Sequence, residues 1–154
     1  MSFSTAPTVK AAIRTRLAAD SNLTNVQITH GSPYPKRPEG ELVLIGRAVA
    51  GDPFGTFGAG QSPHALGQTS REERYTIDLV VSVLSSARDD YATLEARAYQ
   101  IAGYIDTNLR AWQASAFDGV ARWVIPTGSE DREGLDNDNR EASVTMTLSV
   151  AARI

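Results

Sequence analysis

Residues 72–112 have the sequence EERYTIDLVVSVLSSARDDYATLEARAYQIAGYIDTNLRAW and contain the two strongest hydrophobic patterns of the chain. In Glu72–Ser85 apolar residues alternate with polar ones, which predicts a strand with one buried face. In Asp89–Trp112 apolar residues recur at spacings of three and four, which predicts a long helix capped by Ser86 or Asp89. Such a helix is expected to lie across the sheet as its main cover. Its apolar stripe consists of Tyr91, Leu94, Ala98, Ile101, Ile105, Leu109 and Trp112.

The rest of the chain adds one helix and four strands to this unit. A shorter helix is predicted over Pro7–Ala19, with Ser4 or Thr5 as its cap, because its apolar residues recur every four positions. The further predicted strands are Val26–His30, Glu41–Ala50, Val120–Ile125 and Arg140–Ile154. The order α-β-β-β-α-β-β predicts one α+β domain over residues 1–154, with a mostly antiparallel sheet of about five strands and the helices on one face.

The predicted core lies between the long helix and the central strands. Leu94, Ile101 and Ile105 are expected to face the sheet. Their expected partners are Ile77, Leu79, Val81, Val144, Met146 and Leu148. The last strand, Arg140–Ile154, would reach about 50 Å when fully extended, whereas a globule of this size is about 38 Å wide. We therefore expect this strand to bend at a bulge or to project beyond the body.

Composition narrows the classes of function. The chain has 154 residues, a net charge of -3 and no cysteine. The slight negative charge argues against a dedicated nucleic-acid surface, and the lack of cysteine excludes disulfides, thiolate catalysis and cysteine–zinc sites. The N-terminal sequence lacks the pattern of a secretory signal, and no apolar run approaches the roughly 20 residues that span a bilayer. The absence of cysteine suits a protein made in the cytoplasm.

Residues 51–70, GDPFGTFGAGQSPHALGQTS, form a long Gly/Pro-rich segment between two predicted strands. Because these strands are consecutive, they are expected to pair as an antiparallel hairpin with this loop at its tip. Loops of this length are usually functional or disordered. Phe54, Phe57 and Leu66 are apolar, which predicts an arm that packs these three interface residues against another protein.

No motif in the chain predicts catalysis or cofactor binding. His30 and His64 belong to no metal-ligating pattern, and the chain contains no G-x-S-x-G sequence. The glycines of residues 55–60 are followed by no Gly-Lys-Ser/Thr sequence and no predicted helix, so they do not form a phosphate loop. We therefore expect a protein with no catalytic residues, no cofactor and no metal site, and hence no enzyme.

A predicted acidic loop spans Ser129–Asn139. It resembles the start of a calcium loop at Asp136, but the sixth position is Glu141 instead of glycine and the twelfth is Thr147 instead of glutamate, so no tight metal site is expected. The loop is either a solvated turn or a negative patch that faces a partner or a pore. The candidate residues are Glu130, Asp131, Glu133, Asp136 and Asp138.

The organisation of the chain resembles the tail terminator proteins of long-tailed bacteriophages, within the broad group of tail-completion and head–tail joining proteins. The likeness lies in the short leading helix Pro7–Ala19, the hairpin Glu41–Ser85 with its inserted loop, and the alternating last strand Arg140–Ile154. The long helix, which begins D-D-Y-A-T-L-E, also fits. The likeness covers the chain from Pro7 to Ile154 and concerns organisation more than any single motif.

The resemblance implies a ring, commonly six-fold, that caps the tail tube and joins it to the head connector. It implies the chain itself, the tail tube protein and connector proteins as partners, with DNA passing through the lumen without specific binding. The location would be the tail or neck of a virion assembled in the host cytoplasm. Two alternatives remain open: another neck or head-completion protein, or a small ligand-binding domain or enzyme with a lid at residues 51–70.

Overall fold

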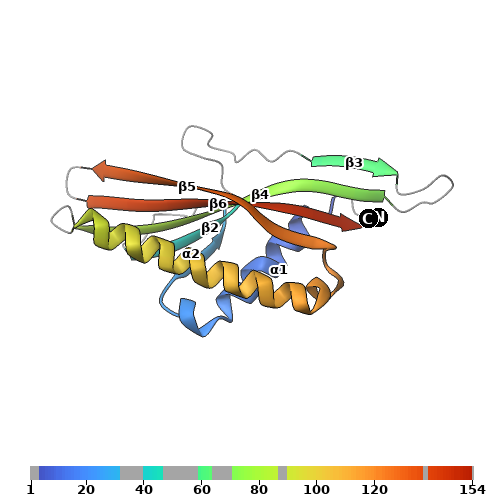
Figure 1. Ribbon diagram of the computed structural model, residues 1–154, viewed down its shortest axis with the longest axis horizontal. Coiled ribbons are helices and arrows are strands. Elements are labelled where there is room, and N and C mark those ends of the chain that lie inside the picture. Colours follow the sequence, from blue (N-terminus) through green and yellow to red (C-terminus); the bar gives the residue numbers. More distant parts are fainter. Residues whose placement is uncertain are drawn as a thin grey trace.

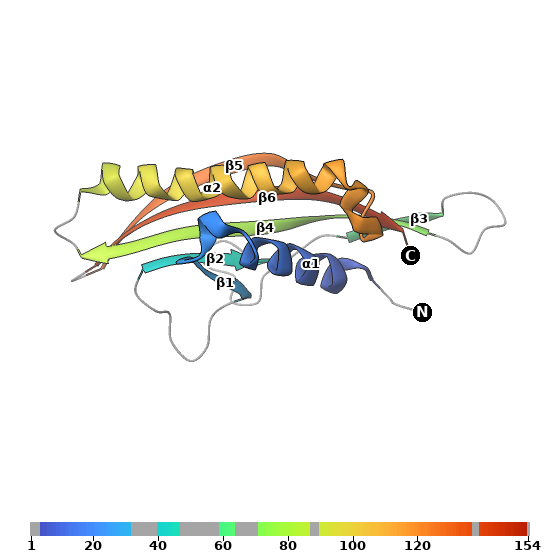
Figure 2. The ribbon, with the colours of Figure 1, turned by 90° about the horizontal axis from the view of Figure 1, so that it is seen from below.

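A computed structural model describes residues 4–31, 40–46, 59–63, 71–86, 90–136 and 139–153 of the chain. Two helices lie on one face of a six-stranded sheet (Figures 1 and 2). The elements are α1 (Ala6–Ala18), η1 (Ser21–Leu23), β1 (Gln27–His30), β2 (Gly40–Ile45), β3 (Ala59–Pro63), β4 (Arg71–Ser86), α2 (Tyr91–Ala114), η2 (Ala116–Gly119), β5 (Trp123–Asp136) and β6 (Asn139–Arg153). The predicted α+β class and element order are confirmed.

The strands are ordered β1-β2-β4-β6-β5 across the sheet, and β3 pairs with β4 beyond the end of β2. β1 and β2 are parallel, and the other pairs are antiparallel. The expected hairpin between the strands that flank residues 51–70 is confirmed by the pairing of β2 with β4. The strand β3 is a correction, because it lies inside the segment that was predicted to be an irregular loop.

β5 is much longer than predicted. The sequence predicted a strand that ends at Ile125 and an acidic loop over residues 129–139, but β5 continues to Asp136 and pairs with β6 along its length. Pairing with β6 outweighs the low strand propensity of this acidic stretch. β5 is also an edge strand, where charged side chains can reach water. The last strand was expected to bend at a bulge or to project beyond the body. β6 pairs with β4 without a register shift, and a register shift falls instead between Pro126 and Gly128 of β5.

The core lies between α2 and the helix-facing side of β4 and β6. α2 begins after Asp90, whose side chain accepts a hydrogen bond from the backbone N–H of Ala92, so the cap lies one residue after the predicted Asp89. Ile101 and Ile105 are fully buried and Leu94 is 6% exposed. They share one apolar cluster with all six predicted strand partners, so the predicted helix face is confirmed.

Replacing Ile101 with alanine should lower the free energy of unfolding by roughly 2–5 kcal/mol, because it removes buried methyl groups and leaves a cavity. Urea unfolding of the wild type and of Ile101→Ala measures this difference. Gln113→Ala, at an exposed position of the same helix, is the matched control and should stay within about 0.5 kcal/mol of the wild type. Equal effects of the two substitutions would contradict the assigned helix face.

A buried carboxylate fixes α1 to the sheet. Glu73 on β4 is 0% exposed. It accepts hydrogen bonds from Ser4 Oγ at 2.6 Å, from the backbone N–H of Thr5 at 2.7 Å and from Thr5 Oγ1 at 2.7 Å. A negative charge at this position also complements the positive end of the helix dipole. Glu73 thus takes the capping role that the sequence assigned to Ser4 or Thr5, while Ser4 Oγ accepts a further bond from Ala6 N at 3.1 Å.

The phenol of Tyr75 lies beside this cap, with its hydroxyl 3.2 Å from Thr5 Oγ1. Burial, together with the nearby charge of Glu73, raises the pKa of Tyr75 from 10.0 to about 12. The pKa of Tyr75 is thus higher in the folded than in the unfolded protein. The stability that the neutral phenol contributes is therefore complete below pH 10.0 and is lost as the pH rises through about 12.

Glu73→Ala should destabilise the protein and loosen the start of α1, since each buried donor left without a partner costs about 1–3 kcal/mol. Urea unfolding measures the loss of stability, and hydrogen exchange at the first turn of α1 measures the local effect. Ser4→Ala removes only one of the three donors and should cost less. If Glu73→Ala left exchange in α1 unchanged, the carboxylate would not be what holds the helix.

Candidate assembly surfaces

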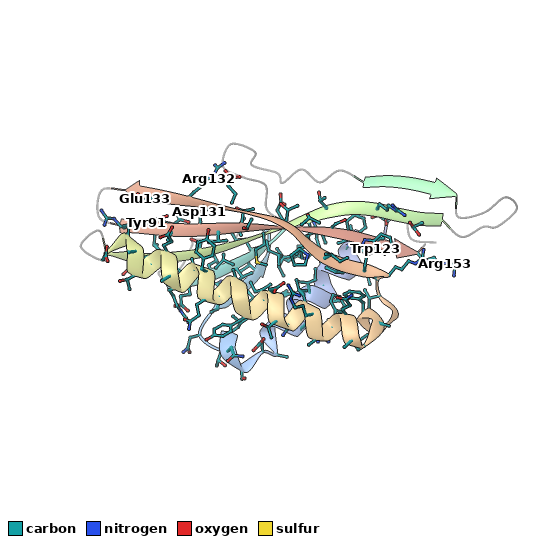
Figure 3. The ribbon with its side chains drawn as sticks, viewed as in Figure 1. Tyr91, Trp123, Asp131, Arg132, Glu133 and Arg153 are labelled. Carbon is teal, nitrogen blue, oxygen red and sulfur yellow. The ribbon has the colours of Figure 1, made fainter. Side chains whose placement is uncertain are left out.

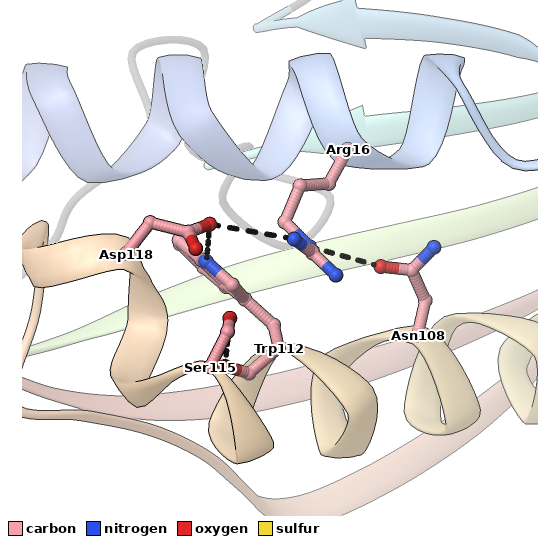
Figure 4. Close-up of polar contacts among 5 residues, drawn as sticks. All are labelled: Arg16, Asn108, Trp112, Ser115 and Asp118. Atoms are coloured by element: carbon pink, nitrogen blue, oxygen red, sulfur yellow. Dashed lines mark hydrogen bonds and ion pairs between the residues drawn. The ribbon is translucent and has the colours of Figure 1, made fainter.

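A group of hydrogen bonds and an ion pair at the C-terminal end of α2 holds α1 against α2 (Figure 4). Trp112 Nε1 donates to Asp118 Oδ2 at 2.8 Å, and Arg16 Nη1 lies 3.4 Å from the same oxygen. Arg16 Nε donates to Asn108 Oδ1 at 3.3 Å. The Arg16 guanidinium also lies 5.4 Å from the centre of the buried Trp112 ring, a cation–π contact. These contacts join residues of α1, α2 and η2.

The turn after α2 is left-handed. Ala116, Phe117 and Asp118 have φ values of 53°, 54° and 50°, a conformation that costs non-glycine residues roughly 1–2 kcal/mol each. Two contacts hold the turn in place: Phe117 is buried edge-on against Trp112, with 5.3 Å between ring centroids, and Asp118 binds the Trp112 indole. The turn directs the chain from α2 into Arg122 and Trp123 at the start of β5.

At that end of the sheet, arginines gather around one tryptophan. The Arg74 and Arg122 guanidiniums lie 5.2 Å and 5.9 Å from the Trp123 ring centroid. Both bind the buried carboxylate of Glu72, each with a hydrogen bond of 2.7 Å. Arg153 is exposed and is the register partner of Glu72 across β4 and β6. We call the set Arg74, Arg122, Trp123 and Arg153 the basic end.

The electrostatics of the basic end are dominated by its arginines. Hydrogen bonds from Arg74 and then from Arg122 hold the pKa of Glu72 below its usual value of 4.5. One carboxylate therefore serves two guanidiniums, and within the described residues no ion pair involves Arg153. The sequence analysis missed this group because its arginines are far apart in the chain. Only the strand register brings them together.

Two of the predicted acidic residues, Asp131 and Glu133, lie near the opposite end of the same sheet (Figure 3). Asp131 and Glu133 pair with the core residues Val144 and Ala142 of β6. Since directly opposite residues in an antiparallel pair share a face, Asp131 and Glu133 lie on the helix-facing side, where α2 contributes Glu95. We call Glu95, Asp131 and Glu133 the acidic end. The figure shows Asp131 and Glu133 at one end of the molecule, and Trp123 and Arg153 at the other.

Tyr91 and Tyr99 of α2 respond to this negative charge. Burial, followed by the charges of Asp131 and Glu95, raises the pKa of Tyr99, and a hydrogen bond with Asp131 adds to this effect. Burial and the charges of Glu95, Asp131 and Glu133 also raise the pKa of Tyr91. Among the residues that the structure describes, no ion pair involves Asp131 or Glu95, so their charges are not neutralised by a neighbouring side chain.

Two ion pairs accompany the acidic end, one exposed and one partly buried. Arg132 Nη2 lies 3.0 Å from Glu130 Oε1 on the outer face of β5, and Arg140 Nε lies 3.7 Å from Glu133 Oε1. A solvent-exposed pair such as Arg132–Glu130 contributes only about 0–1 kcal/mol. Glu130 is thus separated from Asp131 and Glu133 by the sheet, so the predicted acidic residues do not form one cluster.

Several predicted residues cannot be placed. Asp136 is the last residue of β5, and Asp138 lies outside the described residues. The predicted interface residues Phe54, Phe57 and Leu66 lie outside them as well, as does His64. Their roles stay predictions.

His30 lies on β1 beside basic groups of α1. Burial, and then the charges of Lys10 and Arg14, lower the pKa of His30. Across the described ranges, no group of three or more histidine, aspartate or glutamate side chains is arranged to hold a metal ion. Among the helices described, none is long and apolar enough to cross a membrane.

Asp131→Asn should lower the pKa of Tyr99 toward the usual 10.0, because it removes a negative charge that disfavours the phenolate. An NMR titration of ring-labelled tyrosines measures the shift. Glu130→Gln, on the opposite face of β5, is the matched control and should change the pKa less. Equal shifts in the two variants would show that Asp131 does not face Tyr99.

Comparison with known proteins identifies no family for this chain. No family model matches the chain, and no curated protein matches it. Among solved structures, a chain from "Virion of native gene transfer agent (GTA) particle" is similar, with 16% sequence identity and a TM-score of 0.49. The match covers 98% of this chain and 100% of that chain. At this identity and TM-score the likeness assigns no family and no function.

Proposed function

We propose that this chain is a structural protein of a phage-like virion, and that it acts as a tail terminator. In this role it forms a ring that caps the tail tube and joins it to the head connector, with DNA in the lumen. It acts by binding other proteins and catalyses no reaction. The resemblance of its element order to that family supports this assignment.

The observation that carries the proposal is the length of the three longest strands relative to the helix that covers them. β4, β6 and β5 contain 16, 15 and 14 residues, whereas the mean strand has about 5–6. Fifteen strand residues extend about 50 Å, and the 24 residues of α2 extend about 36 Å. The sheet is therefore longer than its helical cover, and the charged ends lie where neighbouring subunits could reach them.

The buried polar side chains support a structural role over a catalytic one. Three such residues are buried among those described: Glu72, Glu73 and Ser82. Glu72 binds two arginines, Glu73 caps α1, and Ser82 Oγ bonds to Glu141. Each of them holds strands or helices together through these bonds. Glu72 also lines a surface pocket with Arg122 and Arg153, where its carboxylate is engaged by guanidinium groups.

Negative-stain imaging of the purified protein tests the proposal, together with mass measurement over a range of concentrations. We expect closed rings, because heterologous contacts whose rotation closes generate rings. Rings of six subunits would match the expected family. A monomer at all concentrations, especially one that binds a small molecule, would overturn the proposal in favour of a domain with a lid.

A second measurement distinguishes a tail terminator from other neck proteins, which differ from it in their partners. Purified protein is mixed separately with tail tubes and with portal or connector particles, and bound material is separated by sedimentation. Binding to the end of the tail tube is expected. Binding to portal particles alone would instead identify a head-completion protein.

A further inference from the structure

We propose that the basic end of one copy binds the acidic end of the next copy. The inference rests on the proposed ring and names the side chains that join its subunits. Arg153, together with Arg74 and Arg122, would bind the carboxylates of Asp131 and Glu95 of the neighbouring subunit. The interaction is electrostatic and joins two different surfaces of the same chain.

The basic end is arranged to bind carboxylates. Arg74 and Arg122 are held between the Glu72 carboxylate and the Trp123 ring, yet their side chains remain 65% and 59% exposed. Stacking and ion pairing fix the guanidinium planes, so less side-chain entropy is lost when a ligand binds. Glu72 neutralises only one of the positive charges. Guanidinium groups bind carboxylates through paired, charge-assisted hydrogen bonds.

The acidic end supplies the complementary groups. Asp131 is exposed and Glu95 is half-buried, and within the described residues neither has a cationic partner. Glu133 has only the long 3.7 Å contact with Arg140. An arginine of a neighbouring subunit would relieve the repulsion among these carboxylates. Their negative charge also disfavours ionisation of Tyr91 and Tyr99.

The two ends cannot meet within one chain. β6 connects them: Ala142 pairs with Glu133, and Arg153 pairs with Glu72. The eleven residues from one position to the other span about 36 Å of strand. Charges further apart than about 10 Å are largely screened at an ionic strength of 0.1 M. Only a second copy can bring a basic end and an acidic end into contact.

Nucleic acid is a weaker candidate for the basic end. Phosphate oxygens also bind arginine, but a chain with a net charge of -3 repels DNA over the rest of its surface. The acidic end, by contrast, is carried by every copy of the chain, so its concentration always equals that of the basic end. The contact between copies also uses both ends, whereas DNA binding would give Asp131 and Glu95 of the acidic end no cationic partner.

Charge reversal at each end tests this contact by analytical ultracentrifugation of the full chain. Arg153→Glu and Asp131→Lys should each raise the concentration at half-assembly at least about tenfold, because like charges would then face each other. An equimolar mixture of the two variants should assemble, since each new charge meets its opposite in the other variant. A chain that carries both substitutions should assemble by itself for the same reason.

Controls separate the contact from folding and from general charge effects. Circular dichroism and thermal unfolding show whether each variant is folded; if Arg153→Glu is not, Arg153→Ala replaces it and should weaken assembly in the same direction. Arg14→Glu changes the net charge equally at an exposed position of α1 and should leave assembly within about twofold of the wild type. Assembly of the wild type should also weaken as salt is raised.

The outcomes separate this inference from the proposed function. If the wild type forms rings and both reversal variants still form them, the proposed contact is overturned and the ring is retained. If the wild type is a monomer, the contact and the ring are both overturned. Rescue in the mixture at the mass of a dimer would support the contact and overturn the ring. Loss of binding to a DNA duplex in Arg153→Glu, with unchanged assembly, would assign the basic end to nucleic acid and overturn the inference.

Discussion

The register between β4 and β6 is the constraint on which the rest of the structure depends. It runs without a shift from Glu72 opposite Arg153 to Ser86 opposite Asn139. A slip of one residue would turn every side chain of one strand to the other face. Ile77, Leu79 and Val81 would then leave the core beneath α2, and Glu73 would leave the start of α1. The same register brings Glu72 beside Arg153 and so forms the basic end.

The elements with strong periodicity were predictable from the sequence. The stripe along α2 and the alternation along β4 and β6 depend on local spacing, which fixes the face that each side chain occupies. Alternation also carried a signal that was not used: Glu73 has the same parity as Tyr75 and Ile77, which places its carboxylate on the buried face. A charged residue at such a position indicates a specific partner, and that partner is the N-terminus of α1.

Other features depend on contacts between distant segments and could not be predicted from local patterns. Ala59–Pro63 contains glycine and proline and lacks apolar alternation, so its pairing with β4 depends on the position of β4 alone. The acidic half of β5 has low strand propensity and is held by β6. The separation of Glu130 from Asp131 by the sheet follows from this pairing, whereas a loop would have left their relative orientation open.

The bonds of Glu73 have a consequence for the path of the chain. Ser4, the first described residue, binds the Glu73 carboxylate, and Ala152, next to the last described residue, pairs with Glu73 in the sheet. At this one position β4 therefore holds α1 through a side chain and β6 through the backbone. The start of α1 is anchored to β4 at the centre of the sheet, whereas β1, the strand that follows α1 in the chain, lies at the edge.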